Sequence, residues 1–145
     1  MSSSEKRIDE IMAQMTLHEK VSMCRAFRLE CFDTNNWTGP SRVHYVDKVD
    51  LEHKGMTKRF TAAFNSREEG EYQFFFTGDR NTELLFDGQR VWKVNSQNTG
   101  IPYEFSNTYK KGSRVDICIK ATTVDTTPLE FYMWSGIMAL IETSP

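Results

Sequence analysis

Residues 69–92 read Glu69-Gly-Glu-Tyr-Gln-Phe-Phe-Phe-Thr-Gly-Asp-Arg-Asn-Thr-Glu-Leu-Leu-Phe-Asp-Gly-Gln-Arg-Val-Trp92. In the first third of this segment, aromatic side chains occupy every second position, at Tyr72, Phe74 and Phe76. A period of two is the pattern of a β-strand with one buried face. The segment therefore predicts a strand that places three large rings in the core.

Two turn signals follow that strand. Residues 78–81, Gly-Asp-Arg-Asn, have the composition of a loop. Asp87-Gly88 is a strong hairpin signal, because both residues tolerate the positive φ that a two-residue turn requires. Leu84 and Phe86 restart the alternation before this turn and residues 90–94 follow it, so we expect a β-hairpin.

Turn residues and alternating patterns extend over most of the chain. The other extended segments that we expect are 43–46, 58–64, 101–109, 114–120 and 129–134. The tail, residues 136–145, shows apolar residues without a clear element. The fold class predicted is mainly β, an antiparallel β-sandwich.

The N-terminal residues 5–24 predict helices instead. An apolar stripe with helical spacing runs through Ile8, Ile11, Met12 and Met15. Thr16 and Glu19 form a capping-box pattern, which predicts a second short helix from Leu17. We therefore expect a helical hairpin that packs on the sheet and offers a surface to a protein partner.

Composition excludes several classes of protein. The chain has 145 residues, enough for one domain with a short appendage. Of these residues 39% are hydrophobic and 26% are charged, which is ordinary for a globular protein. The net charge is −2 and there is no basic run, so no nucleic-acid partner is expected. No apolar run approaches the ~20 residues of a membrane span.

The compartment is not decided by the sequence. The first residues lack the apolar region of a signal peptide, so the chain as written is cytoplasmic, or extracellular or periplasmic if a signal was removed. Cys24, Cys31 and Cys118 are odd in number and lack metal-ligand spacing, which predicts free thiols. Residues 36–38, Asn-Trp-Thr, match a glycosylation sequon that matters only in a secreted protein.

The central segment resembles a known family. Gly-Glu-Tyr-x-Phe, a polar loop, and then Leu-x-Phe-Asp-Gly-x-x-Val, over residues 70–91, resemble the centre of the protective-antigen-type domain. That domain occurs in anthrax protective antigen, in glycosidases and in yeast adhesins. The resemblance extends over about residues 27–134, and it implies an opening strand and loop over residues 27–39. It implies a jelly-roll-like antiparallel β-sandwich and, by its common use, carbohydrate binding.

A second resemblance lies in residues 7–21, Arg-Ile-Asp-Glu-Ile-Met-Ala-Gln-Met-Thr-Leu-His-Glu-Lys-Val. They are similar to the opening of glycoside hydrolase family 3 (β-glucosidase-like) enzymes. This match contains no catalytic residue, and a catalytic (β/α) barrel takes ~250 residues. We therefore expect no enzymatic activity. The expected organisation is a helical segment at 1–26, the β-sandwich at 27–135 and the tail at 136–145.

The protective-antigen resemblance implies where a site lies. In the adhesin branch, two adjacent aspartates in the loop after the central strand bind calcium. Here Asp79 stands between Gly78 and Arg80. Calcium requires several hard oxygen ligands, and an arginine beside them opposes the cation. Calcium is therefore disfavoured, and no cofactor is expected.

A sugar site without metal needs aromatic platforms and planar polar groups. The candidates on or beside the loops at 77–81 and 95–103 are Asp79, Arg80, Asn81, Trp92, Asn95 and Tyr103. For the two aromatic residues the alternative is core or rim packing, and for Asp79 and Arg80 it is a solvated loop.

Two functions remain open besides a catalytic role of the chain's own, which is not expected. The first is a non-catalytic, lectin-like carbohydrate-binding module in a glycosidase context. The second is a structural or protein-interaction module, or a glycosidase remnant without sugar binding. An open, polar pocket with an aromatic rim near residues 77–81 favours the first. A loop plugged by Arg80 favours the second.

Overall fold

The computed structural model describes residues 27–123, 127–134 and 139–142. All the secondary structure in these ranges is β-strand. This corrects the predicted fold class: the described part is all β, with no helix in it. The expected helical hairpin over residues 5–24 lies outside the described residues. The described core needs no helix, because each sheet has the other sheet to cover its apolar face.

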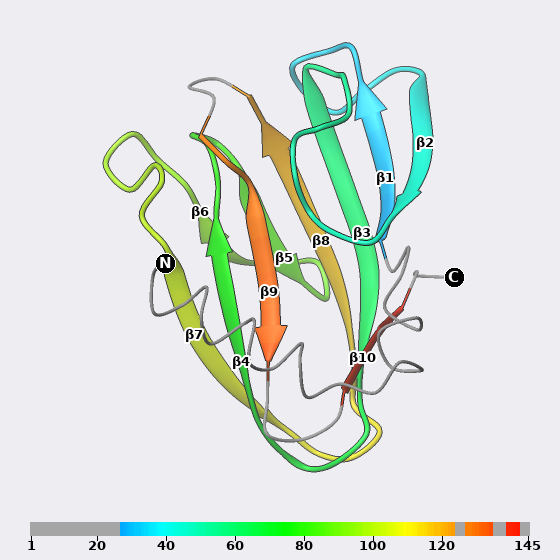
Figure 1. Cartoon of the computed structure of the whole chain (residues 1–145), viewed down its shortest axis with the longest axis vertical. Helices are drawn as coiled ribbons and strands as arrows, with labels where there is room; N and C mark the ends of the chain where they lie inside the picture. Colours follow the sequence, from blue (N-terminus) through cyan, green and yellow to red (C-terminus); the bar gives the residue numbers. More distant parts are fainter. Residues whose placement is uncertain (1–26, 124–126, 135–138, 143–145) are drawn as a thin grey trace.

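The described strands form two antiparallel sheets (Figure 1). Their bounds are β1 Phe27–Phe32, β2 Ser41–Val46, β3 Thr57–Ser66, β4 Gly70–Thr77, β5 Glu83–Phe86, β6 Gln89–Lys93, β7 Tyr103–Tyr109, β8 Arg114–Thr122, β9 Glu130–Trp134 and β10 Ala139–Glu142. The larger sheet has the order β2-β1-β3-β8-β5-β6, and the smaller has the order β7-β4-β9. The long strand β3 pairs with β1 along its first half and with β10 along its second half.

The strands and turns expected in residues 69–92 are confirmed. Tyr72, Phe74 and Phe76 of β4 are fully buried. Asp87 and Gly88 have φ values of 52° and 78° and join β5 to β6 as a two-residue hairpin. However, β4 belongs to the smaller sheet, and β5 and β6 belong to the larger one. The loop at residues 78–82 therefore carries the chain from one sheet to the other.

The core lies between the sheets and is rich in aromatic rings. The Phe74 ring stacks on Phe105 with centroids 5.0 Å apart and meets Phe86 edge-on at 5.1 Å. Because β4 and β7 belong to one sheet and β5 to the other, the Phe74–Phe86 contact joins the two layers, whereas the Phe74–Phe105 stack lies within one sheet. Such offset-stacked and edge-to-face pairs stabilise beyond the burial of apolar area, by about 1 kcal/mol each.

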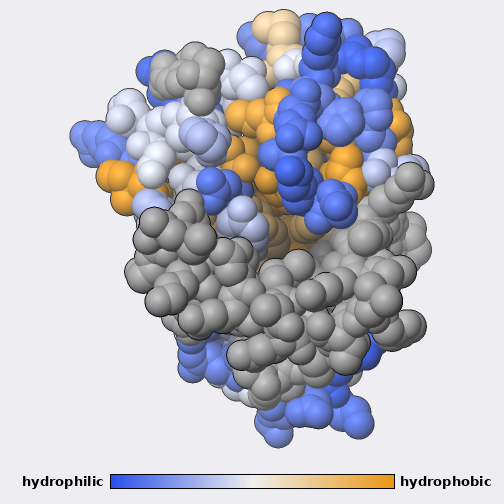
Figure 2. Space-filling view, viewed as in Figure 1, coloured by the Kyte–Doolittle hydropathy of each residue, from blue (hydrophilic) through white to orange (hydrophobic). Residues whose placement is uncertain are grey.

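The connection between β2 and β3 covers one side of this core. Val49 is buried in it and Leu51 packs against it. In the view of Figure 2, hydrophilic side chains gather at the upper right, where this connection runs in Figure 1, with hydrophobic residues beside them. The connection thus presents polar residues to solvent while its apolar residues cover the core.

Two further expectations can be compared with the described residues. Residues 139–142, expected to be part of a tail, form β10, which pairs with β3. Cys31 and Cys118 are free thiols, as predicted, while Cys24 lies outside the described residues. None of the described residues belongs to a helix long and apolar enough to cross a membrane.

Candidate functional site

A groove of about 570 Å³ lies at one end of the larger sheet. The strand ends that line it are uppermost in Figure 1. Its lining consists of one aromatic residue, one methionine and otherwise polar or charged residues: Asn35, Trp37, Met56, Thr57, Asn81, Glu83, Lys93, Lys120, Thr122 and Thr123. A volume of this size is typical of small-molecule sites.

The floor of the groove is a row of charged side chains on adjacent strands. Glu83 of β5 pairs in register with Lys120 of β8 on one side and with Lys93 of β6 on the other. The neighbours of this row along the chain, Leu84 and Ile119, are fully buried. Because side chains alternate between the faces of a sheet, the charged row points outward.

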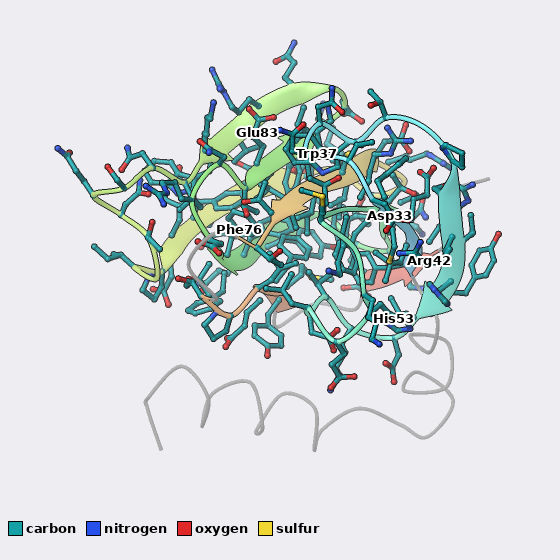
Figure 3. The ribbon with its side chains drawn as sticks, turned by 90° about the horizontal axis from the view of Figure 1, so that it is seen from above. Asp33, Trp37, Arg42, His53, Phe76 and Glu83 are labelled. Atoms are coloured by element: carbon teal, nitrogen blue, oxygen red, sulfur yellow. The ribbon has the colours of Figure 1, made fainter. Side chains whose placement is uncertain are left out.

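Trp37 forms the wall of the groove. Its indole Nε1 donates a hydrogen bond to the carbonyl oxygen of Lys58 at 2.9 Å. The ammonium of Lys120 lies 5.8 Å from the centre of the indole ring, within cation–π range. The Trp37 ring is therefore contacted from two directions. Figure 3 shows Trp37 and Glu83 close together in the view from above.

The backbone of Trp37 is in an unusual conformation, with φ of 55°. A bulky residue in the left-handed region is rare, and such strain costs about 1–3 kcal/mol. The other non-glycine residues with positive φ in the described ranges are Asn81 and Asp87, and Asn81 also lines the groove. Strained residues held by their surroundings cluster at functional sites, which makes the groove the leading candidate.

The loop that carries Trp37 is fastened at both ends. Thr34 Oγ1 donates to the carbonyl oxygen of Thr38 at 2.7 Å and accepts from the amide of Thr38 at 3.2 Å. Thr57 Oγ1 donates to the carbonyl oxygen of Thr34 at 2.8 Å. The Arg42 guanidinium donates to both carboxylate oxygens of Asp33, and these hydrogen bonds hold the pKa of Asp33 below its usual value. A fixed loop loses little entropy when a ligand binds.

Asp79, one of the expected site residues, is fully buried. Its Oδ1 accepts a hydrogen bond from the amide of Arg80 at 2.7 Å, and its carbonyl oxygen accepts one from the amide of Thr82 at 3.1 Å. Thr122 of β8 donates from its hydroxyl to the carbonyl oxygen of half-buried Arg80. The carboxylate of Asp79 thus shapes the loop, and a sugar has no access to it in this structure.

The two aromatic candidates stack on each other. Trp92 of β6 and Tyr103 of β7 have ring centroids 4.1 Å apart and planes 4° from parallel. Tyr103 in turn stacks on Phe105 at 5.2 Å. Because β6 and β7 are edge strands of different sheets, this stack closes that side of the core. The structure therefore favours the alternative of rim packing for both residues.

The two asparagine candidates have different roles. Asn81 is exposed and lines the groove, and its amide donates to the carbonyl oxygen of Val94 at 2.9 Å. Asn95 uses its Oδ1 to accept from the amides of Gln97 and Asn98, at 2.8 and 3.1 Å. The loops at 77–81 and 95–103 do meet, because Gly100 donates from its amide to the carbonyl oxygen of Gly78 at 3.4 Å. Of the six expected residues, Asn81 alone lines the groove.

Sequence reasoning missed the residues that build most of the groove, above all Trp37, Lys120 and Glu83. A signal for Trp37 was present: it sits among turn residues, Asn35-Asn36 before it and Gly39-Pro40 after it, with no strand pattern to bury it. No comparable signal exists for Lys120 and Glu83, which meet only through strand pairing.

Metal-ligating side chains do not gather in the described part of the chain: it holds no group of three or more His, Cys, Asp or Glu residues placed to bind a metal ion. Burial raises the pKa of the Cys31 and Cys118 thiols, so neither is activated as a thiolate. The expectation that the protein uses no cofactor stays a prediction.

No family model and no curated protein matches the chain. Solved structures do match it. A β-glucosidase from Kluyveromyces marxianus in complex with glucose has a TM-score of 0.64 at 11% identity over 77% of this chain and 16% of that chain. An anti-sigma factor domain-containing protein from Clostridium clariflavum has 0.60 at 17% identity over 79% and 44%. A GH31 α-xylosidase from Xanthomonas citri has 0.51 at 15% identity over 80% and 15%.

At these identities the comparisons establish a shared fold alone. The chain has the fold of β-rich domains that occur in two glycosidases and in one protein of another kind. It spans less than half of each of these chains, so it matches only a part of each. The finer resemblances to the protective-antigen-type domain and to glycoside hydrolase family 3 stay predictions.

Proposed function

We propose that this protein is a non-catalytic carbohydrate-binding module that holds a sugar in the groove beside Trp37. The observation that carries the proposal is the indole ring on the groove wall, fixed by its hydrogen bond to Lys58 and kept in a strained backbone conformation. Nothing in the packing of the core requires that conformation, because Trp37 lies in a loop outside the buried cluster.

The chemistry of the lining suits a sugar. One face of a pyranose ring carries C–H groups that pack on an aromatic ring, while its hydroxyls need donors and acceptors around the rim. Asn35 and Asn81 each offer a planar amide with two donors and an acceptor. Thr123 and Lys120 add a hydroxyl and an ammonium on the same side.

A glycosidase context is part of this proposal. The β-glucosidase and the α-xylosidase that share the fold use it as a minor part of a larger chain. Residues 7–21 resemble the opening of a family of such enzymes. In that context the module would bring its protein to a glycan, and the hydrolysis would belong to another domain or subunit.

The test is binding to a glycan array, followed by titration calorimetry with the sugar that binds best. Trp37→Ala should weaken binding about tenfold or more, which corresponds to about 1.4 kcal/mol. Tyr45→Ala is the matched control, because Tyr45 is an exposed aromatic residue on β2 and does not line the groove. Circular dichroism verifies that both variants fold.

Two results would reject sugar binding in the groove. One is a blank array for the parent protein. The other is a Trp37→Ala variant that binds sugar as tightly as the parent does, which would show that the sugar binds outside the groove. Release of reducing sugar in the same incubations would show that the protein is catalytic, and we expect none.

A protein-interaction module is the second candidate, and one observation favours it. Val43 and Tyr45, which share a face of the edge strand β2, are 41% and 52% exposed. An edge strand with exposed apolar residues is a template for pairing with another chain. Under this alternative, Tyr45→Lys would abolish the association that analytical ultracentrifugation detects. Trp37→Ala would not change that association.

A further inference from the structure

We propose that the groove selects acidic glycans, those whose sugars carry carboxylate or sulfate groups. This inference rests on the proposed function and specifies its ligand class. It comes from the charges of the larger sheet, which are not distributed as the net charge of the chain would suggest. The chain as a whole carries −2, whereas the outward face around the groove is cationic.

The cationic face is one continuous row across five strands. The strand registers place Glu30 beside Arg59, Arg59 beside Lys120, Lys120 beside Glu83, and Glu83 beside Lys93. Cross-strand neighbours on one face have Cβ atoms about 5 Å apart, so these side chains act on one another and on any ligand above them. The row runs from β1, which is next to one edge of the sheet, to β6 at the other edge, and its Lys120 lies against the Trp37 ring.

Both carboxylates of this row are already engaged by cations. Glu30 lies 2.9 Å from the Arg28 guanidinium and 2.9 Å from that of Arg59. The hydrogen bonds from Arg59 hold the pKa of Glu30 below its usual value, so it stays ionised within this cluster.

Glu83 lies 3.2 Å from the Arg90 guanidinium and 3.9 Å from the Lys93 ammonium. Together with Arg28 and Arg90, the row therefore has five cationic side chains against two carboxylates, an excess of three positive charges.

Lys120 is the group best placed to receive an anion. No carboxylate among the described residues lies within 4.0 Å of its ammonium, and its cross-strand neighbour Glu83 points its carboxylate toward Arg90 and Lys93 instead. Its ammonium lies 5.8 Å from the Trp37 ring centre. A sugar packed on that ring would hold an acidic substituent beside this ammonium.

The expected size of the effect follows from exposure. An ion pair at an accessible site contributes up to about 1 kcal/mol, and salt screens it with a Debye length of about 10 Å at 0.1 M. We therefore expect an acidic oligosaccharide to bind about fivefold more tightly than a neutral one of equal length at low salt. The preference should fall as salt is added, while binding of the neutral oligosaccharide should stay nearly constant.

The experiment is calorimetry at 50 and 500 mM NaCl with four probes of similar length. They are an oligogalacturonate, a sulfated oligosaccharide, a neutral cello-oligosaccharide and oligo-glutamate, which carries carboxylates without sugar. Lys120→Gln should remove most of the preference for the acidic sugars and lower the affinity for the neutral one much less, because glutamine keeps a hydrogen-bond donor at this position of the lining. Lys111→Gln is the matched control, because Lys111 is an exposed lysine in the turn between β7 and β8.

Each outcome separates this inference from the function on which it rests. Equal affinities for acidic and neutral sugars, both reduced by Trp37→Ala, would overturn the inference and leave the carbohydrate-binding module standing. Oligo-glutamate binding as tightly as oligogalacturonate would overturn it too, because charge alone would then suffice. Lack of binding to any sugar would overturn the proposed function itself. The galacturonate and sulfate arms identify which acidic group is preferred.

Discussion

Trp92 and Trp37 are both half-buried, yet they contribute to the molecule in opposite ways. Trp92 stands on an edge strand and stacks its full face on Tyr103, which continues into the core through Phe105. Trp37 stands on a loop, holds a backbone carbonyl with its N–H group and lines a groove. An aromatic ring whose face is covered by another ring stabilises the fold, whereas a ring on a groove wall is available to a ligand.

The largest difference should appear in stability. Trp92→Ala removes a cross-sheet stack and should lower the free energy of unfolding by about 3 kcal/mol. Trp37→Ala removes one hydrogen bond while alanine keeps the strain of a positive φ, so a loss of about 1 kcal/mol is expected. Urea titration of the two variants measures both. Equal losses of unfolding free energy would contradict the distinction between a ring that stabilises the fold and a ring that is available to a ligand.

The next effect concerns the loop that joins the two sheets. Asp79→Ala leaves the amide of Arg80 without its acceptor and should cost about 2 kcal/mol of unfolding free energy. Asp79→Asn keeps an acceptor at that position and should cost less. Sugar binding should survive in the folded fraction of both variants. A selective loss of sugar binding in a fully folded Asp79→Asn protein would show that Asp79 contributes to the binding site.

A smaller effect is expected in the charged row beside Trp37. Glu30→Gln loses charge-assisted hydrogen bonds to Arg59 and should lower stability by about 1.5 kcal/mol at neutral pH. The pKa of Glu30 is held below its usual value of 4.5, chiefly by the hydrogen bonds from Arg59. Its stabilising contribution is therefore complete above pH 4.5 and is lost as the pH falls through the lower folded pKa.

Urea titrations of the parent and Glu30→Gln at several pH values measure this dependence. The stability gap between them should be constant from neutral pH down to about 5 and should narrow in more acidic solution. A gap that widened on acidification would contradict the sign of the pKa shift. Glu68→Gln, at an exposed position in the turn before β4, is the control and should show no gap.

The smallest effect on stability, with a large effect on binding, is expected for Trp37→Gly. Glycine adopts positive φ without strain, so relief of about 1 kcal/mol should offset the lost hydrogen bond to Lys58. The free energy of unfolding should stay within about 1 kcal/mol of the parent value while sugar binding disappears. Trp37→Phe should retain part of the binding, because it keeps a ring without the N–H group. A binding-competent Trp37→Gly protein would show that the ring is not the platform.

The predictions from sequence succeeded where the physics is local. The period of two in residues 72–76 and the positive φ tolerated by Asp87-Gly88 predicted strand β4 and the β5–β6 hairpin at the right places. They failed where the outcome depends on a distant partner. Residues 139–142 carry no strong strand pattern of their own, and they form β10 because the second half of β3 offers an open edge.

The candidate site shows the same division. The sequence placed Trp92 and Tyr103 on or beside loops, but a strand pattern does not say which rings will face each other across two sheets. Asn81 was anticipated, because loop position and residue type are local properties. Lys120 and Glu83 were not, because they are 37 residues apart in sequence and become neighbours only through the β5–β8 register.

The amino-acid sequence by itself determined the strand periodicity, the Asp-Gly hairpin and the composition of one β-rich globular domain. These follow from side-chain alternation and backbone steric limits within a few residues. Only the tertiary structure decided that β4 and the β5–β6 hairpin lie in different sheets, that Asp79 is buried, and that Trp37 lies against a cationic row. Each of these depends on contacts between segments far apart in the chain, whose geometry is set by sheet pairing and core packing.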